Sequence, residues 1–141
     1  MSRRRRAGFT LIEVLLVLVI LVILGSLVGI QIRGAQKKGL VNAAKSQVGM
    51  FDSPLKLYLL DVGQYPSTSA GLEGLRTAPA EAQGQGAMKW NGPYLEKAVP
   101  LDPWGRQYNY ASPGRHNSET YDVWSLGPDG ADGTDDDIGN W

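Results

Sequence analysis

The chain has 141 residues, 14 basic and 14 acidic side chains and no cysteine, so its formal charge is zero. This length suggests one domain of modest size, and the lack of cysteine excludes a fold held by disulfides. Seven of the acids lie between Glu119 and Asp137, which argues against the basic surface that a nucleic-acid partner requires.

The chain starts with a basic run followed by a long apolar segment. Arg3 to Arg6 precede the segment 9–30, whose only charge is Glu13. A helix over these residues would be about 33 Å long, enough to cross a hydrocarbon core of about 30 Å. Basic residues next to a membrane helix stay in the cytoplasm. The sequence therefore predicts a transmembrane helix at 9–30 and an extracytoplasmic domain at 31–141.

Glu13 is an unusual residue for such a segment, because a charge costs about 2.5–3.5 kcal/mol at the centre of a membrane helix and marks a functional position. Cleavage between Gly8 and Phe9 would remove residues 1–8 as a leader. It would also create an α-amine four residues before Glu13, on the same helix face. The alternative is an ordinary secretory signal, cut after the apolar region at a small-residue site. The stretch after Leu24 offers only a poor site of that kind.

The segment Gly8-Phe9-Thr10-Leu11-Ile12-Glu13 with its apolar run resembles the processing signal of type IV pilins and type II secretion pseudopilins. The resemblance implies that a prepilin peptidase cuts after Gly8 and methylates Phe9. It also implies that Glu13 serves filament assembly by pairing with the Phe9 amine of a neighbouring subunit. The family often has a proline where this chain has Ile30.

After residue 30 a helical period continues in more polar sequence. Apolar residues recur at steps of three or four: Leu40, Ala44, Val48, Phe51, Leu55 and Tyr58. We expect one helix from about Phe9 to about Leu60, with its second half packed on the domain. Four glycines between residues 25 and 39 each cost about 1 kcal/mol relative to alanine and predict local weakness. Pro54 either kinks this helix or starts a new one, with Asp52 or Ser53 as N-cap.

The rest of the domain is loop-rich with a small sheet. A short helix at 71–75 is expected to bury Leu72 and Leu75. The aromatic residues of this region are expected to fill the core: Trp90, Tyr94, Trp104 and Tyr108. The stretches 107–110 and 121–126 predict two antiparallel strands. His116, in the turn between them, is expected to be solvated and without a partner.

The stretch after the second strand is rich in aspartate and glycine. Five aspartates lie between positions 129 and 137. Calcium takes six to eight oxygen ligands from carboxylates and backbone carbonyls, so this composition suits a calcium site. Zinc is excluded by the lack of cysteine and the remote histidine, and the EF-hand pattern is absent. The alternative is an acidic solvated tail, but clustered aspartates repel one another, and Ile138 and Trp141 are apolar residues that favour packing.

Further blocks extend the resemblance over nearly the whole chain. They are Tyr65-Pro66, Gly71-Leu72, Gly92-Pro93-Tyr94-Leu95, Asp102-Pro103-Trp104-Gly105, Ser112-Pro113-Gly114, Ser125-Leu126-Gly127-Pro128-Asp129-Gly130 and Asp137-Ile138-Gly139-Asn140-Trp141. They resemble the major pseudopilin family of the type II secretion system, general secretion pathway protein G. That family carries a calcium site whose ligands match the Leu126 carbonyl and the side chains of Asp129 and Asp137. Candidates for the remaining ligands are Asp132, Thr134, Asp135 and Asp136.

The resemblance implies an α+β, type IV pilin-like fold, with a long N-terminal helix on a small domain. It implies a subunit that polymerises into a periplasmic pseudopilus and drives protein export across the outer membrane. The implied partners are copies of the chain, minor pseudopilins, an inner-membrane platform, an assembly ATPase and the secreted proteins. A type IV pilin or a minor pseudopilin is the nearest alternative. A membrane-tethered periplasmic enzyme is disfavoured, because no catalytic arrangement stands out.

Overall fold

The computed structural model describes residues 8–80 and 90–141, without the side chains of residues 27–33. The chain divides into two compact units, residues 1–38 and residues 39–141. Most of the predicted leader, residues 1–7, lies outside the described residues.

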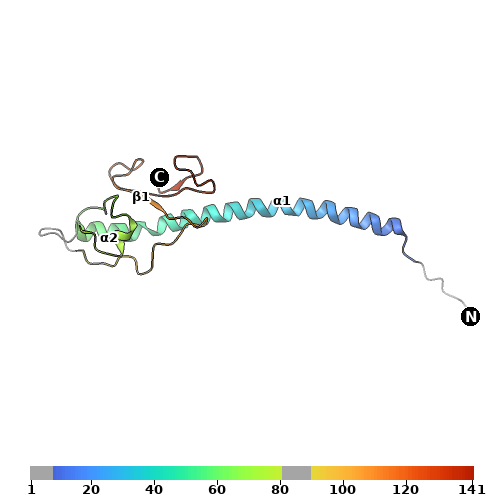
Figure 1. Cartoon of the computed structure of the whole chain (residues 1–141), viewed down its shortest axis with the longest axis horizontal. Helices are drawn as coiled ribbons and strands as arrows, with labels where there is room; N and C mark the ends of the chain where they lie inside the picture. Colours follow the sequence, from blue (N-terminus) through green and yellow to red (C-terminus); the bar gives the residue numbers. More distant parts are fainter. Residues whose placement is uncertain (1–7, 81–89) are drawn as a thin grey trace, which may run out of the picture. The chain divides into compact units, whose positions relative to one another are not determined.

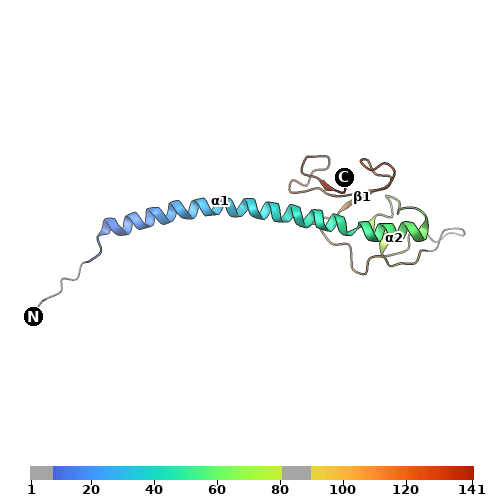
Figure 2. The same cartoon turned by 180° about the vertical axis from the view of Figure 1, so that it is seen from behind.

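Helix α1 (Leu11–Met50) begins in the first unit and ends in the second, and α2 (Asp52–Val62) follows it directly (Figures 1 and 2). The helix α1 is unbroken at the four glycines where weakness was expected. Within the described residues, no helix is both long enough and apolar enough to cross a membrane. The side chains at 27–30, part of the predicted span, lie outside the described residues.

The junction between α1 and α2 answers the question that Pro54 raised. The chain restarts at Phe51, the N-cap of α2, so the predicted cap at Asp52 or Ser53 is wrong. Pro54 then lies in the first turn of α2, where a missing N–H costs little because no partner within the helix exists. The Leu55 N–H donates to the Phe51 carbonyl at 3.0 Å, so helical hydrogen bonding resumes within one turn of the junction.

The core of the second unit confirms most of the predicted helical stripe. Ala44, Val48, Phe51, Leu55 and Tyr58 are at most 4% exposed. Leu40, 38% exposed, is not part of the core, so that assignment was wrong. The 3-10 helix η1 (Leu72–Leu75) buries Leu72 and Leu75 as expected.

The aromatic residues show a mixed result. Tyr108 is buried, and its ring packs edge-on against Phe51 with centroids 5.5 Å apart. Trp90 and Tyr94 are half-buried against the core. Trp104 is also half-buried but lies outside the core cluster.

The sheet has three antiparallel strands in the order β1-β2-β3: β1 (Asn109–Ala111), β2 (Asp122–Ser125) and β3 (Ile138–Gly139). The first two confirm the predicted strands. The third was not predicted, because two residues give no periodic signal. In its register Ser125 pairs with Ile138 and Trp124 with Gly139, so β3 holds the end of the chain against the central strand.

Candidate functional site

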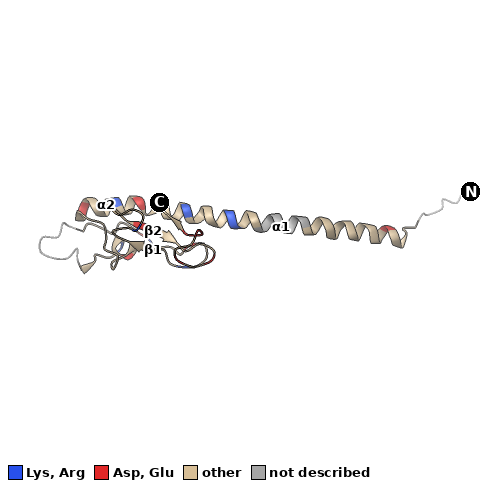
Figure 3. Ribbon diagram, turned by 90° about the horizontal axis from the view of Figure 1, so that it is seen from above, with Lys and Arg blue, Asp and Glu red and all other residues tan. Residues whose placement is uncertain are grey.

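The loop between β2 and β3, residues 126–137, is called the aspartate loop here, and Figure 3 shows acidic residues gathered in it. Because Ser125 pairs with Ile138, the two ends of the loop are held side by side. Leu126 follows one of these paired residues and Asp137 precedes the other. The sheet therefore brings together two of the residues that the sequence assigned to calcium.

A buried network fixes the first turn of this loop. The Ser125 hydroxyl donates to Asp102 Oδ2 at 2.6 Å and accepts a hydrogen bond from the Gly127 N–H at 3.1 Å. Asp102 Oδ1 accepts from the backbone N–H of Trp104 and of Arg106, at 3.0 and 2.8 Å. The Asp-Pro-Trp-Gly block thus forms a turn whose buried carboxylate positions the aspartate loop, a role that the sequence did not indicate.

Gly127 is a position where only glycine fits. Its φ of +64° lies in the left-handed region, and a Cβ placed there would collide with the carbonyl oxygen of Asp136. The Arg106 guanidinium donates to the Gly127 carbonyl at 2.7 Å. The two ends of the loop therefore lie in direct contact at this residue.

The five aspartates have different partners. Asp129 Oδ1 accepts from the Ala131 N–H at 3.0 Å, and this bond, with help from the Thr134 hydroxyl and the Arg106 charge, lowers the pKa of Asp129. Asp132 accepts from the Trp124 indole N–H at 2.9 Å and lies 3.5 Å from Arg115 Nη1. Asp135 is exposed and Asp136 is half-buried.

Asp137 carries the observation that bears most on a cation. Its Oδ2 accepts from the Gly133 N–H at 2.7 Å. Its Oδ1 is buried and has no hydrogen-bond partner among the described residues. A buried carboxylate oxygen needs a partner, and a cation is one that would satisfy it. No three acidic or histidine side chains cluster as a metal site in the part of the chain that is described. Calcium also accepts backbone carbonyls as ligands, so the donor set fits calcium with fewer carboxylates.

His116 differs from its prediction. Its side chain is 53% exposed, but its ring stacks on Trp141 with centroids 3.8 Å apart and 14° between the planes. Its Nδ1 lies 3.5 Å from the buried carboxylate of Asp122. The expectation of a residue without a partner was wrong, because β3 brings the last residue back to the turn between β1 and β2.

The N-terminal segment forms the second candidate site. The helix starts at Leu11, and the Glu13 N–H approaches the Thr10 hydroxyl at 3.4 Å. Thr10 and Glu13 have the spacing of a capping box, a local signal that the sequence analysis missed. A carboxylate in the first turn also interacts favourably with the helix dipole. The Glu13 backbone is therefore part of the helix start, and its carboxylate lies in the first turn.

Comparisons with known proteins place the chain in two steps. A profile of the prokaryotic N-terminal methylation motif matches residues 3–29, which defines a pilin-like protein. A profile of the type II secretion system protein G matches residues 31–141, and the chain belongs to this family.

Relatives and a solved structure agree with this placement. Core protein G of the type II secretion system from Aeromonas hydrophila is 43% identical over 141 residues, covering 100% of this chain and 96% of the relative. Its counterpart from Pseudomonas aeruginosa is 42% identical, with coverages of 100% and 99%. The crystal structure of the major pseudopilin from enterohaemorrhagic Escherichia coli has a TM-score of 0.64 and 34% identity. The match covers 77% of this chain and 92% of the Escherichia coli chain.

The family membership confirms the central predictions from the sequence. The chain is a subunit of the pseudopilus of the type II secretion system, and this family is a structural part of the secretion machinery rather than an enzyme. The pilin-like α+β fold is confirmed as well. The cleavage site, the Glu13 contact and the calcium ligands stay predictions.

Proposed function

We propose that the chain is made as a precursor, cut between Gly8 and Phe9 by a prepilin peptidase and methylated on Phe9. Residues 9–30 then anchor the subunit in the bacterial inner membrane, with residues 31–141 in the periplasm. The supporting observation is the apolar surface of this segment. Every large apolar side chain from Phe9 to Leu24 is at least 47% exposed, and such a surface requires lipid or other helices to cover it.

Glu13 serves assembly in this proposal. It is the only charge in the segment 9–30, and in the filament core it pairs with the α-amine of Phe9 from a neighbouring subunit. A carboxylate placed among apolar helices needs a cationic partner, which cleavage creates on the next subunit. Arg3 to Arg6 keep the N-terminus of the precursor on the cytoplasmic side until cleavage removes them.

The aspartate loop binds calcium in this proposal. The Leu126 carbonyl, Asp129 and Asp137 hold the ion, and the remaining ligands come from among Asp132, Thr134, Asp135 and Asp136. The buried Oδ1 of Asp137, which has no hydrogen-bond partner among the described residues, carries this part of the proposal. When bound, the ion supplies positive charge between carboxylates that repel one another. It thereby stabilises a domain that has no disulfide.

Addition of subunits at the inner membrane lengthens the pseudopilus and pushes secreted proteins through the outer membrane. The partners are further copies of the chain, minor pseudopilins, the inner-membrane platform with its ATPase, and the secreted proteins. The test is complementation of a strain that lacks its own copy of this protein. The wild-type chain restores secretion, whereas a Gly8→Leu variant, which blocks cleavage, accumulates as precursor. Secretion restored by the uncleaved form would contradict the proposal.

A further inference from the structure

The helix α2 exposes apolar side chains on the face turned away from the core. Leu57 and Leu60 are 52% and 72% exposed, and Met50, the last residue of α1, is 63% exposed. Residues three apart share one helix face, so Leu57 and Leu60 form a strip on α2, called the apolar strip here, and Met50 precedes it at the end of α1. Leu55 and Tyr58 on the opposite face are fully buried. Lys56 lies one turn before Leu60, at the margin of the strip.

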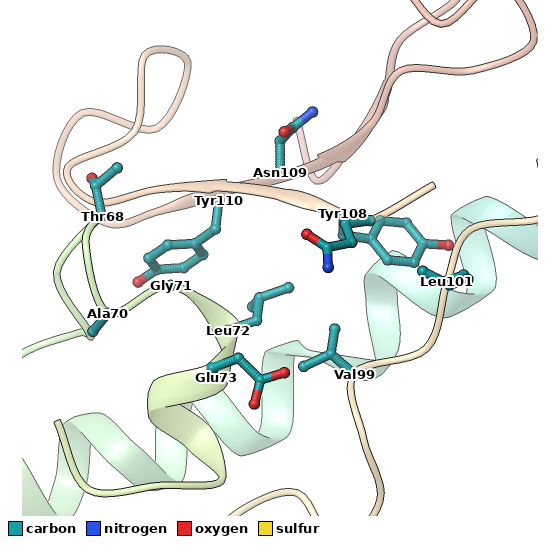
Figure 4. Close-up of a pocket in the computed structure, with 11 residues that line it drawn as sticks. Thr68, Ala70, Gly71, Leu72, Glu73, Val99, Leu101, Tyr108, Asn109 and Tyr110 are labelled. Carbon is teal, nitrogen blue, oxygen red and sulfur yellow. The ribbon is translucent and has the colours of Figure 1, made fainter. Parts of the chain in front are cut away.

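The same unit carries a groove between η1 and β1, shown in Figure 4. The groove has a volume of about 290 Å³. Buried Leu72 and half-buried Val99 line it, and Leu101, 53% exposed, lies at one end. Glu73 supplies the one carboxylate among the described residues that line it. The groove thus combines three apolar side chains with polar ones, among them Thr68 and Asn109, and with one negative charge.

A filament needs two different surfaces on each subunit. A patch that pairs with itself closes a two-fold dimer, whereas a surface that pairs with a different surface leaves both ends free and continues as an open helical array. The chain is a pseudopilus subunit, and in the proposed function its partner is another copy of itself. The apolar strip and the groove are two such different surfaces within one unit.

We propose that in the pseudopilus the apolar strip of one subunit packs into the groove of the next. The inference rests on polymerisation of the chain and identifies the surfaces that the globular units use. The charges complement each other, because Lys56 flanks the strip and Glu73 flanks the groove. Among the described residues, Lys56 forms an exposed ion pair with Asp52 at 2.8 Å and Glu73 forms one with Arg76 at 3.5 Å. Exposed pairs of this kind contribute little stability, so they exchange readily for a contact between subunits.

The lack of cysteine in the chain makes the contact testable by disulfide crosslinking. The full chain carrying Leu60→Cys and Leu101→Cys is expressed in bacteria that assemble pseudopili and is then oxidised mildly. We expect a ladder of dimers, trimers and higher oligomers, since each subunit offers both partners. A mixture of the two single variants gives dimers only. The matched control pairs Leu60→Cys with Glu119→Cys, an exposed residue outside the groove. Filaments that form without a ladder, or an equal ladder in the control, would overturn the proposal.

Charge reversal gives a second test that needs no crosslink. Lys56→Glu should lower the amount of pseudopilus several-fold, and adding Glu73→Lys should restore it. Equal losses for both single variants with no recovery in the double variant would contradict the contact. Electron microscopy of the wild-type strain distinguishes failure of polymerisation from failure of the contact between strip and groove. Absence of wild-type filaments refutes polymerisation itself, whereas wild-type filaments with no recovery refute only the strip and groove.

Discussion

The carboxylate of Asp137 provides a sharp test of the proposed calcium site. Its buried Oδ1 has no hydrogen-bond partner among the described residues, whereas Oδ2 accepts from the Gly133 N–H at 2.7 Å. A buried acceptor left unsatisfied costs about 1–3 kcal/mol, and more when it is charged. Asp137→Asn removes the charge and keeps the volume. Without calcium we therefore expect the variant to unfold at the same temperature as the wild type, or higher.

Calcium should reverse this order. An ion at 100 times its dissociation constant stabilises the folded state by about 2.7 kcal/mol. In a domain of about 100 residues each kcal/mol raises Tm by about 4–8 °C, so the wild type should gain about 10–20 °C. The variant, which has lost a ligand charge, should gain little.

The assay is thermal unfolding of the globular unit, residues 39–141, followed by circular dichroism in EDTA, calcium and magnesium. The exposed variant Glu119→Gln, outside the loop, is the matched control and should behave as the wild type does. If Asp137→Asn is destabilised equally in EDTA and in calcium, Asp137 has a purely structural role. If calcium leaves the wild-type Tm unchanged, the calcium proposal is wrong.

Three further predictions concern other parts of the chain. Glu13→Gln keeps a side chain suited to the capping box but removes the charge. Electron microscopy should then show no filaments, whereas immunoblots should show normal cleavage. Normal filaments would refute the pairing with Phe9. Burial alone would raise the pKa of Asp122, but N–H groups of the turn at 115–117 donate to the carboxylate and hold its pKa below the usual value. That stabilisation is present above about pH 4 and is lost as the pH falls through the lowered pKa. In urea unfolding, the free energy of unfolding of Asp122→Asn should therefore depend less on pH on the acid side than that of the wild type. Equal slopes would contradict this. Gly127→Ala should cost about 2 kcal/mol or more in urea unfolding, because φ is +64° and the Cβ meets the Asp136 carbonyl; a loss below about 0.5 kcal/mol would contradict the tight turn.

Periodic features of the fold could be predicted from the sequence. The stripe from Ala44 to Tyr58 predicts helical structure with one buried face, which runs on from α1 into α2. The strands at 109–111 and 122–125 follow from aromatic and β-branched residues between turns. The position of the α2 cap could not be predicted. The chain restarts at Phe51 without a side-chain cap, because packing of Phe51 in the core outweighs capping preference.

The hydrogen bonds that position the aspartate loop could not be predicted from the local sequence. The sequence indicated the acidic residues, but their positions depend on Asp102, which lies 23 residues before Ser125 and hydrogen-bonds to it at 2.6 Å. The contact of His116 with Trp141 has the same origin. It exists because β3 pairs with β2, and a strand of two residues leaves no pattern to recognise.

The measurement that tests the central claim most directly is the intact mass of subunits from sheared pseudopili. Filaments are collected from bacteria that express this chain with the secretion machinery, and their protein is analysed by mass spectrometry. We predict a single subunit species that starts at Phe9 and carries one added methyl group. Filaments built of a chain with a different N-terminus, or a correctly cut chain that never enters filaments, would contradict the account.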